Sequence, residues 1–400
     1  MELTLLVIIA SLIATIVLVR RGIEIGISLF ITATVIALIM SPKRIPEIMF
    51  SVITSSKTWF LASMSCSIAV FAELYRNTKL IEELGIGLTR ALKSSKIALM
   101  LIPAVIGLIP VAGGALMSAP IVYTLSRELE ISKDIGVYIN VWFRHTIFLF
   151  YPISQLIIIA SILSGYPVEL LALRQLPVAV FMILIGYFAS LRSIRDERGI
   201  AIASESRPLR ISALPLTIAL VAAVSLKLLM GNYGMVIGVI TGIAVLLFLI
   251  KPSLKLIYTS VFNRRVRGIT LAAFSIIYLQ TVFTMSGAAE LITKVISQNT
   301  AIPMLLLEFM VPGFLGALTG SPLTGFVLSL PIFSGLKSLS ISDVNIIYIS
   351  SYVNYIGSPA HLCYIYTAEY FNVKIDRVYR YLAPSIALTL IFSLIIFSLV

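Results

Sequence analysis

Four ionisable side chains lie inside long apolar stretches of this 400-residue chain. Arg144 and His145 belong to the stretch NVWFRHTIF, His361 belongs to GSPAHLC, and Glu308 belongs to LLLEFMV. These two histidines are the only ones in the chain. An ionisable group at membrane depth is costly to bury, so it marks a candidate pathway for a substrate or an ion.

Arg144 is the strongest candidate for binding an anion. It follows Asp134 by ten residues, which in a helix is a depth of roughly 15 Å. A guanidinium binds carboxylate or phosphate through paired hydrogen bonds. We therefore expect a substrate anion at Arg144. A structural role is the alternative, with Glu308 or backbone carbonyls as its partners.

The histidines and several neutral polar residues are candidates for coupling transport to an ion. His145 and His361 titrate in the useful range and would carry protons, and Glu308 is a second candidate for a proton or cation. Pro359 removes a backbone donor and opens its helix. The freed carbonyls, together with four side chains, would ligate Na⁺: Asn140, Ser321, Asn354 and Ser358. A purely structural role for these residues is the alternative.

Two further apolar stretches, 97–125 and 301–336, are interrupted by glycine and proline in PVAGGALMSAP and GALTGSPLTG. Glycine permits a sharp turn and close approach of a ligand, and the helix after each turn begins with free N–H groups that suit an anion. Close packing of small residues between membrane helices is the alternative. The substrate-binding candidates at these tips and in the spans that follow are Gly113, Gly114, Ser118, Asn140, Thr319, Gly320, Ser321, Thr324 and Asn354.

The composition identifies the elements that position these residues. Hydrophobic residues make up 59% of the chain, charged residues 12%, and the mean hydropathy is +1.05. A soluble domain has about 25% charged residues, so a soluble enzyme, a disordered tail and a disulfide scaffold are excluded. The apolar stretches are long and continuous, which favours helices over barrel strands. The chain is predicted to be an all-α polytopic membrane protein.

The cysteines and the overall charge point to no further partner. Cys66 and Cys363 each stand alone in an apolar run, so we expect neither a disulfide framework nor a cysteine metal site, and no cofactor. The net charge of +12 is explained by basic residues in cytoplasmic loops, without nucleic acid.

The distribution of basic residues predicts the topology. With re-entrant hairpins and the N-terminus outside, 22 of the 30 Lys and Arg residues fall in inside loops, as the positive-inside rule requires. If one of the two hairpins crossed the membrane fully, every later loop would move to the opposite side, and the excess of basic residues inside would be lost. With two re-entrant hairpins, the chain would lie in the cytoplasmic membrane with both termini outside. The ten predicted spans lie near residues 3–19, 22–40, 58–75, 134–162, 168–191, 211–230, 233–250, 268–288, 344–370 and 381–399.

The two halves of the chain follow one plan. Residues 1–192 and 211–400 each contain three spans, an amphipathic segment, a hairpin, an interrupted span (134–162 or 344–370) and a last span, joined by a charged cytoplasmic linker at 193–210. Five crossings per half make the second half inverted relative to the first. Inverted repeats with interrupted elements at matching positions are typical of secondary transporters.

The motifs PVAGGALMSAP, NVWFRH, LTGSPLTG and NYIGSPAHLC resemble the ion transporter superfamily, which includes divalent-anion/sodium symporters and citrate and gluconate permeases. Within it, the chain looks most like the DUF401 family of integral membrane proteins. The resemblance implies a scaffold and a transport domain in each protomer, protomers that often dimerise, and elevator-like movement. Sodium/dicarboxylate members carry Ser-Asn-Thr at both tips, whereas this chain has Met-Ser-Ala and Gly-Ser-Pro.

The sequence therefore predicts a secondary transporter and not an enzyme. Its substrate would be a small anion, with an organic carboxylate as the favoured class, coupled to H⁺ or Na⁺. A cation/proton antiporter using Glu308 and His361 is the alternative. A more distant alternative is an intramembrane hydrolase with Ser321 or Ser358 beside His361, but the Gly-x-Ser-x-Gly nucleophile motif is absent from the sequence.

Overall fold

The structure is a computed structural model that describes residues 10–11, 13–19, 21–109, 115–194, 196, 207–287 and 303–399. These residues form 18 α-helices and one 3-10 helix, with no strand among them. The chain is an all-α polytopic membrane protein, as predicted. Among the described residues, six helical segments are long and apolar enough to cross a membrane: α4 (Ser56–Asn77), α10 (Val168–Ser190), α11 (Leu209–Met230), α12 (Asn232–Ile250), α13 with α14 (Leu254–Met285) and α20 (Ile375–Leu399).

Short helices join the second and third spans of each half. Helix α2 (Ile25–Met40) bends by 120° into η1 (Pro42–Arg44) and α3 (Ile45–Thr54). At the matching place in the second half, α13 (Leu254–Val261) precedes α14 (Arg264–Met285). Neither α3 nor α13 was predicted, because segments of 8–10 residues lack the length that marks a span.

The interrupted stretches are pairs of short helices. The hairpins consist of α6 (Ser95–Gly107) with α7 (Ala115–Glu128), and of α16 (Met304–Thr319) with α17 (Pro322–Leu336). The interrupted spans consist of α8 (Lys133–Phe148) with α9 (Gln155–Ser164), and of α18 (Ile341–Ile356) with α19 (Leu362–Tyr370). The predicted amphipathic segment of the first half is α5 (Leu80–Ala91), whereas its counterpart before 301–336 falls within 288–302, outside the described residues.

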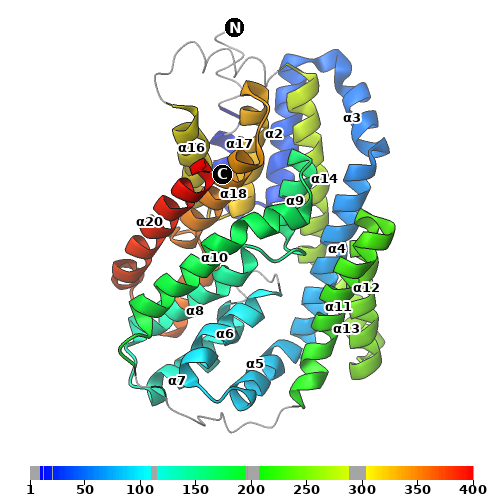
Figure 1. Cartoon of the computed structure of the whole chain (residues 1–400). Helices are drawn as coiled ribbons and strands as arrows, with labels where there is room; N and C mark the ends of the chain where they lie inside the picture. The colour runs from blue at the N-terminus through cyan, green and yellow to red at the C-terminus, as the bar shows by residue number, and fades with distance from the viewer. Residues whose placement is uncertain are drawn as a thin grey trace.

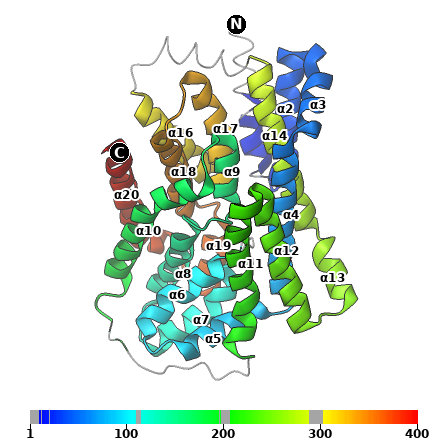
Figure 2. The ribbon, with the colours of Figure 1, turned by 45° about the vertical axis from the view of Figure 1, so that its right-hand side comes forward.

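The helices form two groups (Figures 1 and 2). One group contains α2, α3, α4 and α11 to α14, which pack on one another. The other contains the hairpins, both interrupted spans, α10 and α20. Within this second group, α6 and α7 lie at the opposite end from α16 and α17 in both views.

Helices at matching places in the predicted repeat make similar contacts. Helix α6 packs on α8 as α16 packs on α18, while α19 packs on α7 as α9 packs on α17. Glycine permits the closest of these approaches. A Cβ at Gly107 would lie 2.6 Å from the carbonyl oxygen of Arg144, and one at Gly316 would lie 2.5 Å from that of Ser351. Both hairpins therefore lie against their interrupted spans almost backbone to backbone.

Polar contacts between distant loops join residues that the topology prediction places on the same side. Arg207 pairs with Glu83 at 3.5 Å, and Asp134 pairs with Arg380; all four were predicted inside. The Tyr166 hydroxyl donates to the Leu339 carbonyl at 3.0 Å, and both of these residues were predicted outside.

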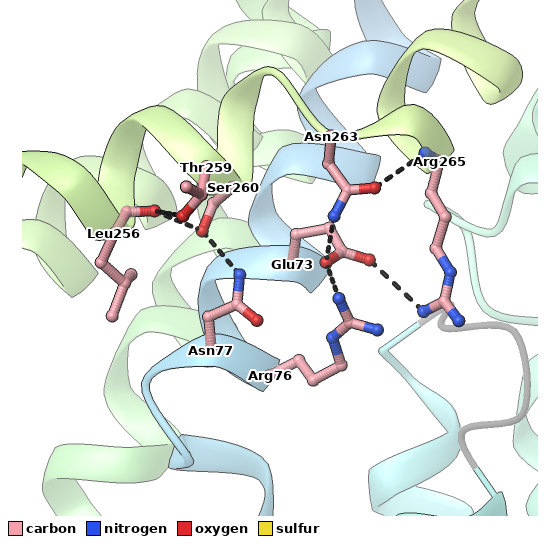
Figure 3. A network of polar contacts seen from close by, with 8 residues as sticks. All are labelled: Glu73, Arg76, Asn77, Leu256, Thr259, Ser260, Asn263 and Arg265. Carbon is pink, nitrogen blue, oxygen red and sulfur yellow. Dashed lines mark hydrogen bonds and ion pairs between the residues drawn. The ribbon is translucent and has the colours of Figure 1, made fainter.

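The densest of these polar networks surrounds Glu73 at the end of α4 (Figure 3). Its carboxylate is buried and accepts from Asn263 at 3.1 Å, and it also pairs with Arg76 and with Arg265, the latter at 3.5 Å. One acid therefore ties α4 to the start of α14, at a point where basic residues accumulate.

Candidate functional site

The breaks of the two interrupted spans meet at the centre of the second helix group. His145 lies in the last turn of α8, and His361 is the residue before α19. Their ring centroids are 4.8 Å apart, and both side chains are buried. One histidine comes from each interrupted span, and the structure places them in contact.

Tyrosines satisfy the carbonyl groups that the breaks release. Tyr352 of α18 donates to the carbonyl of His145 at 2.9 Å, and Tyr348 donates to that of Leu149 at 3.1 Å. At the other break, Tyr379 of α20 donates to the carbonyl of Gly357 at 2.6 Å. Broken helices survive at membrane depth only when neighbours supply such partners.

Arg144 is buried beside the first hairpin with an incomplete set of partners. Its side chain is 5% exposed, and Nη2 donates to the carbonyl of Ile109 at 3.4 Å. Nη1 has no partner among the described residues, and no described carboxylate pairs with this guanidinium. A buried arginine of this kind has both charge and donors available for an anion.

The start of α7 joins the first interrupted span through Asn140. The Asn140 amide donates to the carbonyl of Ala115 and to the Thr367 hydroxyl, each at 3.0 Å, while its Oδ1 has no partner in the described part of the chain. Ser118 is buried, and its hydroxyl donates to the Ala115 carbonyl at 3.3 Å.

The tip of the first hairpin, with the predicted substrate-binding residues Gly113 and Gly114, lies outside the described residues.

The tip of the second hairpin packs directly on the second break. Gly320 has φ +63°, and a Cβ there would lie 2.5 Å from the carbonyl oxygen of Ala360. The Ser358 hydroxyl donates to the carbonyl of Ala317 on α16. Ser358 lies in the break between α18 and α19.

Most hydroxyls of this tip form hydrogen bonds with backbone groups within four residues. Ser321 caps α17 by accepting from the Thr324 backbone N–H at 3.2 Å, which satisfies one of the N–H groups expected to face an anion. Thr319 donates to the carbonyl of Leu315 at 2.7 Å. Thr324 is buried, and its hydroxyl has no partner among the described residues.

The four predicted Na⁺ ligands divide between the two hairpins. Asn140 bonds to the start of α7, whereas Ser321 and Ser358 lie at the tip of the second hairpin. The Asn354 amide donates to the carbonyl of Ser350 at 2.9 Å, and Asn354 also lies beside Gly313 of α16.

Glu308 belongs to a separate polar cluster at the outer end of the second hairpin. Lys337 Nζ lies 3.0 Å from a carboxylate oxygen of Glu308 and 3.0 Å from one of Asp343. Glu308 is fully buried, while Lys337 is 38% exposed. The partner of Glu308 is therefore Lys337, and the suggested Glu308–Arg144 pair is wrong.

Two kinds of site residue were missed in the sequence. Cys363 was expected to stand alone, but it lies beside both histidines, and the ligand atoms of the three residues are within 4.8 Å of one another. The spacing His-x-Cys was the available signal. The second kind is aromatic: Tyr355 lies with its ring centroid 4.1 Å from that of His361, and a tyrosine in an apolar run gives no sign of that contact.

A surface hollow lies elsewhere among the described residues. It has a volume of about 800 Å³ and is lined at the start of α8 by Lys133 and Asp134 and at the start of α20 by Arg377 and Arg380. His145 is twelve residues from Lys133 along α8, roughly 18 Å away. This hollow carries charges of both signs and does not reach the histidines.

Comparison with known proteins gives one family and one detailed structural likeness. The model of the DUF401 family, described as a protein of unknown function, matches residues 3–400. No curated protein matches the chain. The structure is similar to the crystal structure of the Alcanivorax borkumensis YdaH transporter, described as having an unusual topology, with a TM-score of 0.65, 11% identity and 88% of each chain covered. At that identity the likeness concerns the fold.

Proposed function

The chain belongs to the DUF401 family, and we propose that it is a secondary active transporter that moves a small anion across the cytoplasmic membrane, coupled to H⁺ or Na⁺. The substrate class that we favour is the organic carboxylates. Arg144 carries the proposal, because this buried guanidinium keeps Nη1 without a partner among the described residues. A carboxylate would supply both the missing charge and the missing acceptor.

The repeated plan of the two halves supports alternating access. We propose that 1–192 and 211–400 are inverted repeats joined by the cytoplasmic linker 193–210, with ten crossings, two re-entrant hairpins and both termini outside. The equivalent contacts of the hairpins, their location at opposite ends and the same-side polar pairs agree with this topology. In such transporters the substrate lies at the interface of the repeats near the midplane.

Movement of one helix group against the other would expose the site to each side in turn. The group with the hairpins would be the moving body, and the group containing α4 and α11 to α14 would be the scaffold. The fold of a protein described as a transporter and the resemblance to the ion transporter superfamily agree with this arrangement. A homodimer joined through the scaffold is part of the same proposal.

The coupling ion would bind next to the anion. His145 and His361 are in contact, and imidazole nitrogens can accept and release protons, which supports H⁺. Na⁺ would need oxygen ligands, and the second hairpin offers Thr324, whose buried hydroxyl has no partner among the described residues. Imposed gradients of each ion distinguish these two forms of the proposal.

The two alternatives have less support. Glu308 pairs with Lys337 and contacts neither histidine through any bond among the described residues, so an antiporter would lack an acid beside His361. Ser358 donates to a backbone carbonyl, and no described carboxylate pairs with His361 to orient it. That arrangement does not resemble a catalytic triad.

Uptake by purified protein in proteoliposomes tests the proposal. We expect at least one mono-, di- or tricarboxylate in a broad panel to accumulate when a pH or Na⁺ gradient is imposed, and not when both are absent. Phosphate and sulfate belong in the panel because a guanidinium also binds them. Folded protein that transports no anion under either gradient would contradict the proposal. Glu308→Gln should retain uptake, whereas an antiporter would lose cation exchange.

A further inference from the structure

Three soft or borderline metal ligands come together where the interrupted spans break. His145 from the end of α8, and His361 and Cys363 from the start of α19, place their ligand atoms within 4.8 Å of one another. All three side chains are buried, with 5%, 1% and 7% exposure in that order. Residues from both halves of the chain form this cluster, which includes the two histidines offered above for H⁺ coupling but is not needed to bind the anion.

The backbone sets the tautomer of each histidine. His145 Nδ1 lies 2.6 Å from the carbonyl oxygen of Val141, and His361 Nδ1 lies 3.0 Å from that of Ile356. A carbonyl can only accept, so each Nδ1 carries the proton and each Nε2 presents a lone pair. Metal-ligating histidines have this arrangement, in which the second ring nitrogen donates to a carbonyl or carboxylate.

The lone pair of His361 is not saturated by the protein. Its Nε2 has no nitrogen or oxygen donor among the described residues, although the ring is almost fully buried and the Cys363 thiol lies beside it. His145 Nε2 has the Tyr355 hydroxyl at 3.5 Å, at the limit of a hydrogen bond. An unpaired buried nitrogen is costly, and a ligand between the rings and the thiol would remove that cost.

We propose that His145, His361 and Cys363 bind a soft monovalent d¹⁰ metal cation, Cu⁺, with Ag⁺ as its stable probe. Thiolate and imidazole ligands favour soft cations. Charge selects the monovalent ion: Cu⁺ with one thiolate is neutral, whereas Zn²⁺ would leave a net positive charge in a buried region that already holds Arg144.

Metal binding would require the three ligand atoms to move only slightly closer together. Bonds of about 2.0–2.3 Å place three ligand atoms about 3.5–4 Å apart around a metal in a plane, so the largest separation would shorten by about 1 Å. Such a shift is within the reach of side-chain rotation. The neighbouring Tyr355 ring would shield the metal from other ligands.

The test uses Cys66→Ser protein as the background, because Cys66 is the other free thiol of the chain and lies outside the cluster. Ag⁺, and Cu⁺ under reducing conditions, are titrated against a chromophoric chelator. We expect one ion per chain in Cys66→Ser, an affinity at least about 100-fold lower after adding Cys363→Ser or His361→Ala, and a metal-dependent rise of several degrees in Tm that these variants lack.

X-ray absorption at the copper edge keeps the test independent of any folding defect in the variants. The Cys66→Ser protein should show one sulfur and two nitrogen ligands. The proposal is overturned if this protein binds neither ion, if His361→Ala binds as tightly as the background, or if the ligand set lacks nitrogen. Tighter binding of Zn²⁺ than of Cu⁺ would overturn the charge argument. None of these outcomes depends on transport.

Discussion

The two interrupted spans place different side chains at equivalent positions. Arg144 lies four residues after Asn140, and Ser358 lies four residues after Asn354. Each donates to a carbonyl near the end of the first helix of its own hairpin. The acceptor is Ile109 for the arginine and Ala317 for the serine. The serine proton is fully used, whereas the arginine keeps a positive charge and Nη1 without a partner among the described residues.

This difference separates the roles of the two halves. Each interrupted span donates one hydrogen bond to its hairpin. This bond is structural, and a serine hydroxyl is sufficient to make it. A guanidinium is not needed for this bond, and burying its charge is costly. We therefore propose that the anion binds in the first half and that Ser358 has mainly a structural role.

The largest expected effect comes from making the first break resemble the second. Arg144→Ser removes the charge, and the shorter serine hydroxyl does not reach the acceptor of Nη2, so we expect carboxylate uptake to fall by about 100-fold or more, as for loss of a paired, charged contact worth about 3 kcal/mol. Proteoliposome uptake measures it. Arg174→Ser on α10 is the matched control, because Arg174 is half-buried and outside the site, and it should transport as the wild type does.

Substitution of the close-contact glycines tests the equivalence of the two hairpins. Gly107→Ala and Gly316→Ala each place a Cβ within 2.6 Å of a backbone oxygen of the adjacent span. Overpacking of this kind lowers the free energy of unfolding by about 1–3 kcal/mol, which thermal unfolding in detergent would report as a lower Tm. Gly268→Ala, which meets only the flexible Glu24 carboxylate, is the control. A lower Tm for only one of the two substitutions would contradict the equivalence of the two hairpins.

Removal of Lys337 tests the one charged cluster that belongs to the second hairpin only. Lys337→Met leaves the buried Glu308 without its ion pair, and we expect a loss of about 1–2 kcal/mol, reduced from a fully buried pair because Lys337 is partly exposed. Adding Glu308→Gln should restore most of the Tm, because the fully buried charge is then removed, while Asp343, which also loses Lys337, keeps its hydrogen bonds from Ser340. A double variant less stable than Lys337→Met would contradict this explanation.

The smallest effects are expected from the tyrosines that satisfy the breaks. Tyr352→Phe removes the donor to His145, and Tyr379→Phe removes the donor to Gly357. Each should lower the free energy of unfolding by about 1 kcal/mol, and a shift in Tm measures both. If the breaks are structurally equivalent, the two losses will be similar; a loss confined to Tyr352→Phe would show that only the first break depends on its tyrosine.

Much of the fold could be predicted from the sequence, because long apolar runs and interrupting glycine and proline are local signals. The all-α membrane class and the positions of the helices flanking each break followed from them. The contact between His145 and His361 was not predicted, because equivalent positions in two halves need not be neighbours. The role of Cys363 could not, since it depends on the direction in which α19 leaves the break.

Long-range pairing was the other limit of prediction. Glu308 was one alternative partner suggested for Arg144, but Lys337 reaches it because α17 returns beside α16. Sequence spacing does not show which end of a hairpin a charge occupies. The substrate also remains a proposal, since no single residue defines the shape of a pocket formed by two halves.

Anion binding to the wild type and to Arg144→Ala tests the central claim most directly. Isothermal titration in detergent with the carboxylate identified by uptake, with Arg174→Ala as the control, separates binding from transport. We predict that the wild type and Arg174→Ala bind the anion alike, and that Arg144→Ala, with an unchanged Tm in the absence of anion, binds at least about 100-fold more weakly. Equal affinity in the folded Arg144→Ala protein would contradict the assignment of the anion to Arg144.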